Sequence, residues 1–521
     1  MNPRMIGGEM VSWSDLDGIR APGPAGGAAP ARLIGAAGVA GRVLVAGPHD
    51  PTLIDALPAG NVTVLVRGVP DAEALTARFA ERPDVTVCCG GLEKLGAEPA
   101  FDAVVALDGV GRLSSVEGAE LTWGEAFDQL VAALAPGGRL LFGMANPVGA
   151  HRLVALPAEP TDADWDHPGE YDLSRPAGLA RVLARLAEAG LDVDRTYAAY
   201  PSPAAPAVLL GDAILADGAV SGYLAAALSR SFAASAARGD GVAAAQAGGP
   251  TGWVLTDPGR LARRAVRHGL AAELAPGWVF AARRAGGDAA GELPEAVVDG
   301  RRIDRDPVRG WVGDGGACVP PGRTLEDLLI GAAVRREMGE ARTLLARWQG
   351  GAAAGVAADQ VIVGPDGGLV AAGPADAAAL RAFAVTLVRL GLARRWAPGG
   401  ADEVAATLAA MADRDPAGGD SRDRLFDDRE PDGGRPPDAR AFDELIAERD
   451  ALARELAGAV AKARWYERTL TEREAALNRA RRVADLLATA GPARAGAAFV
   501  GGARLARRSA RAILRRVRPR V

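Results

Sequence analysis

The chain has 521 residues, of which 49% are hydrophobic, and its formal net charge is −5. This length predicts about three domains, and the hydrophobic fraction is high enough for each to bury an apolar core. The charge argues against a protein that is basic overall. Three Cys are too few for a disulfide framework, which favours a reducing cytoplasm. No apolar run of about 18 residues and no signal-peptide core is visible, so we expect neither a membrane span nor a leader.

Residues 1–40 are rich in Gly, Pro and Ala and predict a flexible lead-in. Five short apolar runs then alternate with helix-compatible segments such as 71–82 and 123–134. The runs are 42–47, 61–67, 84–89, 101–107 and 134–142. This alternation predicts βαβ units and an α/β, doubly wound parallel sheet.

The order of these elements resembles the class I S-adenosylmethionine-dependent methyltransferases over about residues 40–210. The stretch FDAVVALDGVGRL (101–113) resembles their fourth strand and the loop after it, and LAPGGRLLFGMANP (134–147) resembles their fifth strand. The resemblance implies a Rossmann-like sheet that ends on an antiparallel pair, for which 191–200 and 207–210 are the predicted strands. It also implies S-adenosylmethionine as cofactor and methyl transfer to an oxygen or nitrogen.

The turn after the first run is the first candidate cofactor site. A methyltransferase uses a glycine-rich turn there, because the backbone must approach the cofactor closely. Gly47 matches the first glycine of that pattern, whereas His49 stands where a later glycine is usual and Val45 where an acid is common. Ala46, Gly47 and His49 are therefore candidate cofactor-binding residues. An ordinary strand-to-helix turn is the alternative.

Two further candidate positions follow the second and third runs. Sites of this kind place an acid after the second strand to accept ribose hydroxyls, but this chain has Arg67, which cannot accept a hydrogen bond. Arg67 is an anion-binding candidate, although a solvated side chain at a strand end is favoured. After the third run the family often has Gly-Asp, the acid meeting the adenine amino group. Here Gly91 and Leu92 stand instead, and Glu93 is a possible substitute two positions on.

Asp108 and His151 follow the fourth and fifth runs. Ligands of open α/β sheets bind in the crevice at the carboxyl ends of the strands, so Asp108 is predicted to line the site. His151 is a weak candidate for an acid or base, with a His that caps a loop as the alternative. The chain has no Cys and His spacing typical of a zinc site, and we predict no metal.

Residues 212–411 predict a helical α+β accessory region. Helices are expected over 213–237, 324–348 (one long helix or a pair), 376–392 and 401–411, and a hairpin over 359–370. Residues 412–440 are dominated by charge, Gly and Pro and predict a disordered linker.

The C-terminal part predicts self-association and a charged surface. Residues 441–490 carry a 4–3 apolar pattern that is typical of a coiled coil and predicts a homo-oligomer. Residues 491–521 form a basic amphipathic tail with nine Arg and no acid, which leaves −14 on the rest of the chain. An anionic membrane surface is the preferred partner, and a solvated basic end is the alternative. Nucleic acid is disfavoured because Phe499 is the one aromatic residue there.

A methyltransferase domain with a coiled coil and a basic end is similar to bacterial proteins that modify surface glycans at the inner membrane face. This similarity implies a cytoplasmic protein, peripheral to the membrane, that acts in envelope polysaccharide biosynthesis on a glycan acceptor or beside glycan-synthesis enzymes. The alternative is a catalytically inactive scaffold, because Val45, Arg67 and Gly91 occupy three expected cofactor positions.

Overall fold

The computed structural model describes residues 2–17, 23–58, 60–95, 101–115, 117–119, 121–154, 172–238, 257–287, 292–393 and 400–412. The predicted coiled coil and basic tail, and all but the first residue of the predicted linker, lie outside these residues. The strands of the main sheet are β1 (Arg4–Gly7), β2 (Arg42–Ala46), β3 (Asn61–Val66), β4 (Val85–Gly90), β5 (Phe101–Ala106), β6 (Leu134–Ala145), β7 (Leu191–Tyr200), β8 (Val208–Gly211), β9 (Gly277–Arg284), β10 (Ala296–Val298), β11 (Arg301–Asp306) and β12 (Gly310–Gly313).

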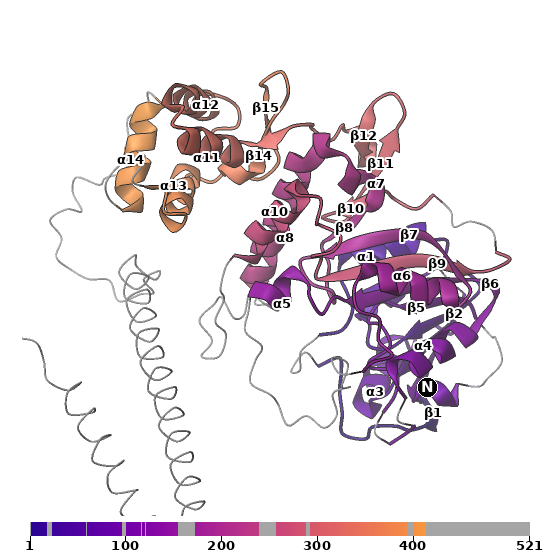
Figure 1. Ribbon diagram of the computed structural model, residues 1–521. Helices are drawn as coiled ribbons and strands as arrows, with labels where there is room; N and C mark the ends of the chain where they lie inside the picture. Colours follow the sequence, from indigo (N-terminus) through magenta and orange to yellow (C-terminus); the bar gives the residue numbers. More distant parts are fainter. Residues whose placement is uncertain are drawn as a thin grey trace, which may run out of the picture. The chain divides into compact units, whose positions relative to one another are not determined.

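These strands form one 12-stranded sheet in the order β1-β4-β3-β2-β5-β6-β9-β7-β8-β10-β11-β12 (Figure 1). The segment β4-β3-β2-β5-β6 is parallel throughout. It follows the 3-2-1-4-5 order of a doubly wound fold. The predicted α/β class is confirmed, and the reason is local: strands buried on both faces read as continuous apolar runs.

Helices cover both faces of this sheet. One face packs on a core built with α1 (Ala28–Ala36), α2 (Pro51–Asp55) and α3 (Val69–Arg78). The other packs on α4 (Trp123–Ala132), α6 (Leu179–Glu188), α8 (Ser221–Arg238) and α10 (Pro258–Arg267). A capping box fixes the start of α4. The Thr122 hydroxyl accepts a hydrogen bond from the backbone amide of Glu125, and the Glu125 carboxylate accepts one from the backbone amide of Thr122. Because an apolar core covers each face of the sheet, polar side chains can gather only at the ends of its strands.

The sheet continues past the predicted boundary at residue 211. Strand β9 lies between β6 and β7 and is antiparallel to both. The implied antiparallel pair at the end of the sheet is therefore present, but its second member is β9, whereas the predicted strand 207–210 forms β8 on the outer edge of β7. The sequence prediction failed here because β9 pairs with residues far away in the chain. Strands β10 to β12, also from beyond residue 211, extend the same sheet.

The lead-in is also part of the fold. Strand β1 pairs in parallel with β4, and α1 contributes Leu33 and Ile34 to the core. Gly90 has φ +143°, and a Cβ there would clash with the carbonyl oxygen of Gly7. Close backbone approach at a glycine thus admits β1 to the sheet edge. The interpretation of residues 1–40 as a loose lead-in is corrected for these described parts.

A smaller α+β body follows. It contains a three-stranded sheet of β13 (Arg323–Thr324), β14 (Val361–Val363) and β15 (Leu369–Ala371), and helices α11 (Leu325–Arg335), α12 (Met338–Gly350), α13 (Ala379–Arg389) and α14 (Ala401–Met411). The predicted hairpin is confirmed by β14 and β15. The segment 324–348 is a helix pair because Arg336 adopts the left-handed conformation, with φ +64°. No helix among the described residues is long and apolar enough to cross a membrane.

Candidate functional site

The candidate site lies at the carboxyl ends of the parallel strands. Gly47, directly after β2, has φ +92°, a conformation that favours glycine. A Cβ at Gly47 would lie 3.3 Å from Cδ2 of Leu113 and 3.8 Å from Cβ of Asp108. The fold thus brings together the predicted Gly47 and Asp108, while Ala46 is fully buried as the last residue of β2.

His49 is buried beneath this turn rather than open to a ligand. The Leu107 amide donates to Nε2 at 3.0 Å, so Nδ1 carries the proton and donates to the carbonyl oxygen of Gly47 at 3.0 Å. Burial lowers the pKa of His49 to about 4, so the ring is neutral at pH 7. Through these two hydrogen bonds the His49 ring links the turn after β2 to the end of β5.

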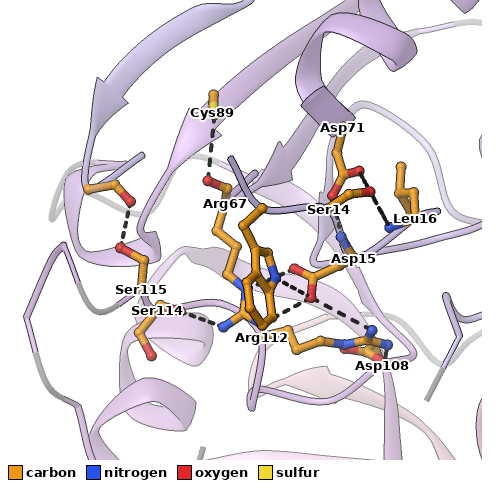
Figure 2. A network of polar contacts seen from close by, with 12 residues as sticks. Ser14, Asp15, Leu16, Arg67, Asp71, Cys89, Asp108, Arg112, Ser114 and Ser115 are labelled. Atoms are coloured by element: carbon orange, nitrogen blue, oxygen red, sulfur yellow. Dashed lines mark hydrogen bonds and ion pairs between the residues drawn. The ribbon is translucent and has the colours of Figure 1, made fainter. Parts of the chain in front are cut away.

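Arg67, directly after β3, forms a buried ion pair with the N-terminal part of the chain (Figure 2). Its Nε and Nη2 donate to the two carboxylate oxygens of Asp15 at 2.8 and 3.0 Å, and its Nη1 donates to the carbonyl oxygen of Ser114 at 3.2 Å. The side chains of Arg67 and Asp15 are only 6% and 7% exposed. The favoured prediction of a solvated Arg67 was wrong, because its partner lies 52 residues earlier in the chain.

The electrostatics of this pair favour its charged form. Burial by itself would raise the pKa of Asp15, but the hydrogen bonds and charge of Arg67 outweigh burial and lower it. A second cation is close, since Nη1 of Arg112 lies 4.0 Å from the Asp15 carboxylate. Arg112 also pairs with Asp108 through Nε at 2.8 Å. Burial raises the pKa of Asp108 despite this pairing.

The segment that delivers Asp15 covers the ends of β3 and β4, and we call residues 8–17 the N-terminal strap. The amide of Asp15 donates to Asp71 at 2.7 Å, and the Ser14 hydroxyl donates to the same carboxylate. The amide of Met10 donates to the carbonyl oxygen of Arg67 at 2.9 Å. A Cβ at Gly68 would clash with the carbonyl oxygen of Trp13, so glycine lets the strap lie on the strand end.

The sequence prediction missed Asp15, Asp71 and Arg112. The available signal was Trp13-Ser14-Asp15, an aromatic and acidic cluster in a segment otherwise rich in Gly, Pro and Ala.

The end of β4 carries a buried acceptor. The amide of Leu92 donates to the carbonyl oxygen of Leu113 at 2.9 Å. The side chain of Glu93 folds back over Gly91, where a Cβ would clash with its Oε2. That Oε2 is buried and has no hydrogen-bond partner among the described residues. Glu93 therefore fills the space of a side chain at position 91 and keeps one acceptor available.

His151 lies apart from this group. It belongs to α5 (Ala150–Val154), after β6. Burial lowers its pKa to about 4, and its buried Nδ1 has no hydrogen-bond partner within the part of the chain that the structure describes. No recorded interaction of the described residues links it to Arg67, Asp15 or Asp108.

No known protein family matches the sequence, and no curated protein is similar to it. Many solved structures are similar to parts of the chain, among them the following three. The [4+2]-cyclase SpnF has 17% identity over 47% of this chain and 75% of its own, with a TM-score of 0.25. Phosphoethanolamine N-methyltransferase 2 of Haemonchus contortus has 12% identity over 49% and 52%, with a TM-score of 0.27. The N-methyltransferase NodS of Bradyrhizobium japonicum WM9 has 16% identity over 32% and 79%, with a TM-score of 0.22. We assign the fold from the strand order of the sheet and not from these matches.

Proposed function

We propose that the sheet domain is a methyltransferase-like module for S-adenosylmethionine, with its site at the carboxyl ends of β2 to β5. The observation that carries this proposal is the buried, unpartnered Oε2 of Glu93 at the end of β4. In the resembling family an acid near this position meets the adenine amino group. An amino donor there would satisfy an acceptor that is otherwise costly to bury.

The remaining residues fit this cofactor in part. Gly47 offers the backbone conformation that a close approach needs. The ribose position does not fit in the state described, because Arg67 has no acceptor and is engaged with Asp15. We therefore propose that the strap leaves the strand ends before the cofactor enters.

When bound, the cofactor would supply an electrophilic methyl group. The chain's part would be to hold it through Gly47 and Glu93, to position an acceptor, and to remove a proton. His151 is a weak candidate for the base, because it follows β6 and its buried Nδ1 has no hydrogen-bond partner among the described residues. The acceptor that we propose is a glycan of the bacterial envelope. The predicted coiled coil and basic tail support this choice, since they would place an oligomer in the cytoplasm at the inner membrane face.

A specific observation favours a second function, that of a non-catalytic scaffold. The strap, the Arg67–Asp15 pair and the Ser114 contact together occupy the end of β3 and bind it to the loop after β5. If the strap stays in this place permanently, it excludes a cofactor from the strand ends, while the sheet remains folded. The protein would then serve to oligomerise and to dock glycan-synthesis enzymes at the membrane.

Calorimetry with S-adenosylmethionine on the full chain separates the two functions. Gly68→Ala should push the strap away through the clash with Trp13 and strengthen binding. Gly35→Ala is the matched control, because a Cβ at that helical position meets nothing within 4 Å. Glu93→Gln should weaken binding, and Gly47→Val should abolish it with an unchanged circular dichroism spectrum. No heat at millimolar cofactor from either wild type or Gly68→Ala would favour the scaffold.

A further inference from the structure

We propose that Arg67 and Arg112 form an oxyanion site at the ends of β3 and β5, in which Asp15 is an internal ligand that a ribose phosphate displaces. S-adenosylmethionine has no anion on its ribose, so this site calls for a ligand of another class. The proposal stands on the geometry of the two Arg side chains and does not depend on methyl transfer.

The first argument is the way the two cations surround one carboxylate. Arg67 binds Asp15 with both prongs of its guanidinium, at 2.8 and 3.0 Å, and Arg112 lies 4.0 Å from Oδ1. This fork is the geometry with which Arg binds carboxylate and phosphate groups. The Trp13 ring lies 5.6 Å from the Arg67 guanidinium, and its Nε1 donates to Asp15 at 2.9 Å. Asp15 thus marks where an oxyanion binds.

The second argument is that the cation belongs to the sheet, whereas the anion belongs to a segment with little buried apolar surface. Arg67 follows a strand in the middle of the parallel segment. The strap has no helix or strand of its own beyond a single bridge between Met10 and Gly68, and Met10 is its one buried apolar side chain. Segments with few buried apolar contacts open at the lowest free energy. When the strap opens, Arg67 stays in place and loses its anion.

The third argument is the chemistry of this position. In doubly wound folds an acid after the second strand takes the free ribose hydroxyls, whereas an Arg takes a phosphate on the ribose. A buried Arg67 without Asp15 would be an uncompensated charge. The carboxylate of Asp108 is paired with Arg112, and that of Asp71 accepts hydrogen bonds from the strap. Neither carboxylate therefore takes the place of Asp15 as the counter-ion of Arg67. The ligand class is therefore a nucleoside with a phosphorylated ribose.

Calorimetry on the full chain with adenosine 2′-monophosphate, and with adenosine as the neutral probe, tests the proposal. Asp15→Asn should bind the phosphate roughly 10- to 160-fold more tightly than wild type, the range that corresponds to one hydrogen bond to a charged group. It should improve adenosine binding far less, because adenosine gains from the open strap but not from the freed charge of Arg67. Adding Arg67→Gln should remove that gain. Asp55→Asn, which unpairs the exposed Arg78, is the control and should change nothing.

Two further measurements guard against misfolding and report on the strap. Gly68→Ala keeps every charge and should raise phosphate affinity as Asp15→Asn does. In wild type the phosphate should change the part of the tryptophan emission that Trp13→Phe removes. Equal affinity of wild type, Asp15→Asn and Gly68→Ala, or binding that survives Arg67→Gln, would overturn the proposal. A chain that shows the expected pattern but binds no S-adenosylmethionine keeps the oxyanion site and loses the methyltransferase function.

Discussion

The buried Arg67–Asp15 pair should show a large coupling free energy in a double-mutant cycle of Asp15→Ala, Arg67→Met and the two together. Both side chains are less than a tenth exposed and share two charge-assisted hydrogen bonds. Removing one partner of such a pair costs about 3–5 kcal/mol, because the other charge stays buried. Each single variant should lose about 3 kcal/mol of unfolding free energy. The double variant leaves no charge uncompensated and should lose about as much as one single variant, which gives a coupling of about 3 kcal/mol.

Urea unfolding of the sheet domain, followed by tryptophan fluorescence, measures this cycle. The exposed pair of Arg78 and Asp55 is a matched control, since its N–O distance is a similar 2.7 Å while its side chains are 55% and 37% exposed. Its coupling should stay below about 1 kcal/mol. Hydrogen exchange of the Asp15 amide, which donates to Asp71, should accelerate in the Arg67→Met variant. A coupling no larger than that of the control would refute the view that this pair holds the strap.

Four other predictions follow from the fold and the sequence. The buried His49 contributes stability that is complete above its unfolded pKa of 6.5 and is lost as pH falls toward about 4, so His49→Gln should remove about 2 kcal/mol of pH dependence between pH 7.5 and 5 in urea unfolding. Gly90→Ala should detach β1, seen as faster amide exchange of residues 4–7 with a loss of about 1–3 kcal/mol, because of its positive φ and its clash with Gly7. The isolated segment 442–487 should be a dimer or trimer by light scattering, and a monomer at high micromolar concentration would contradict the coiled coil. The tail should bind anionic vesicles in a salt-sensitive way and neutral ones little; truncation at Gly491 should abolish binding, and equal binding to both vesicle types would rule the membrane role out.

The parallel part of the sheet was predictable because its signal is local. RVLVA in β2 and NVTVLV in β3 are apolar runs followed by turn residues, and such runs identify buried strands by themselves. The place of β9 was not predictable in this way, since its partners β6 and β7 lie far from it in the chain. Composition misled the prediction for the lead-in, because a Gly-rich segment can still pair as β1 where Gly90 admits it.

The candidate site shows the same division between local and distant information. Gly47 and Asp108 were predictable because strand ends of a parallel sheet meet at one edge. The environment of Arg67 was not, because it depends on a carboxylate 52 residues away. A buried Arg at a strand end needs an anion nearby. A search for that anion among the Asp and Glu of the whole chain, and not only of the segments next to Arg67, is the step that would have found Asp15.

The strength of the strap contact sets what a binding experiment should show. A coupling of about 3 kcal/mol corresponds to a closed state favoured roughly 160-fold, if that coupling is what opening loses. A ligand that needs the open state then binds more weakly by the same factor. An intrinsic dissociation constant of about 1 μM would become roughly 0.2 mM, which calorimetry at millimolar ligand still detects. Gly68→Ala should recover much of that factor if a site exists beneath the strap, and should change nothing if the strap is a permanent part of a scaffold.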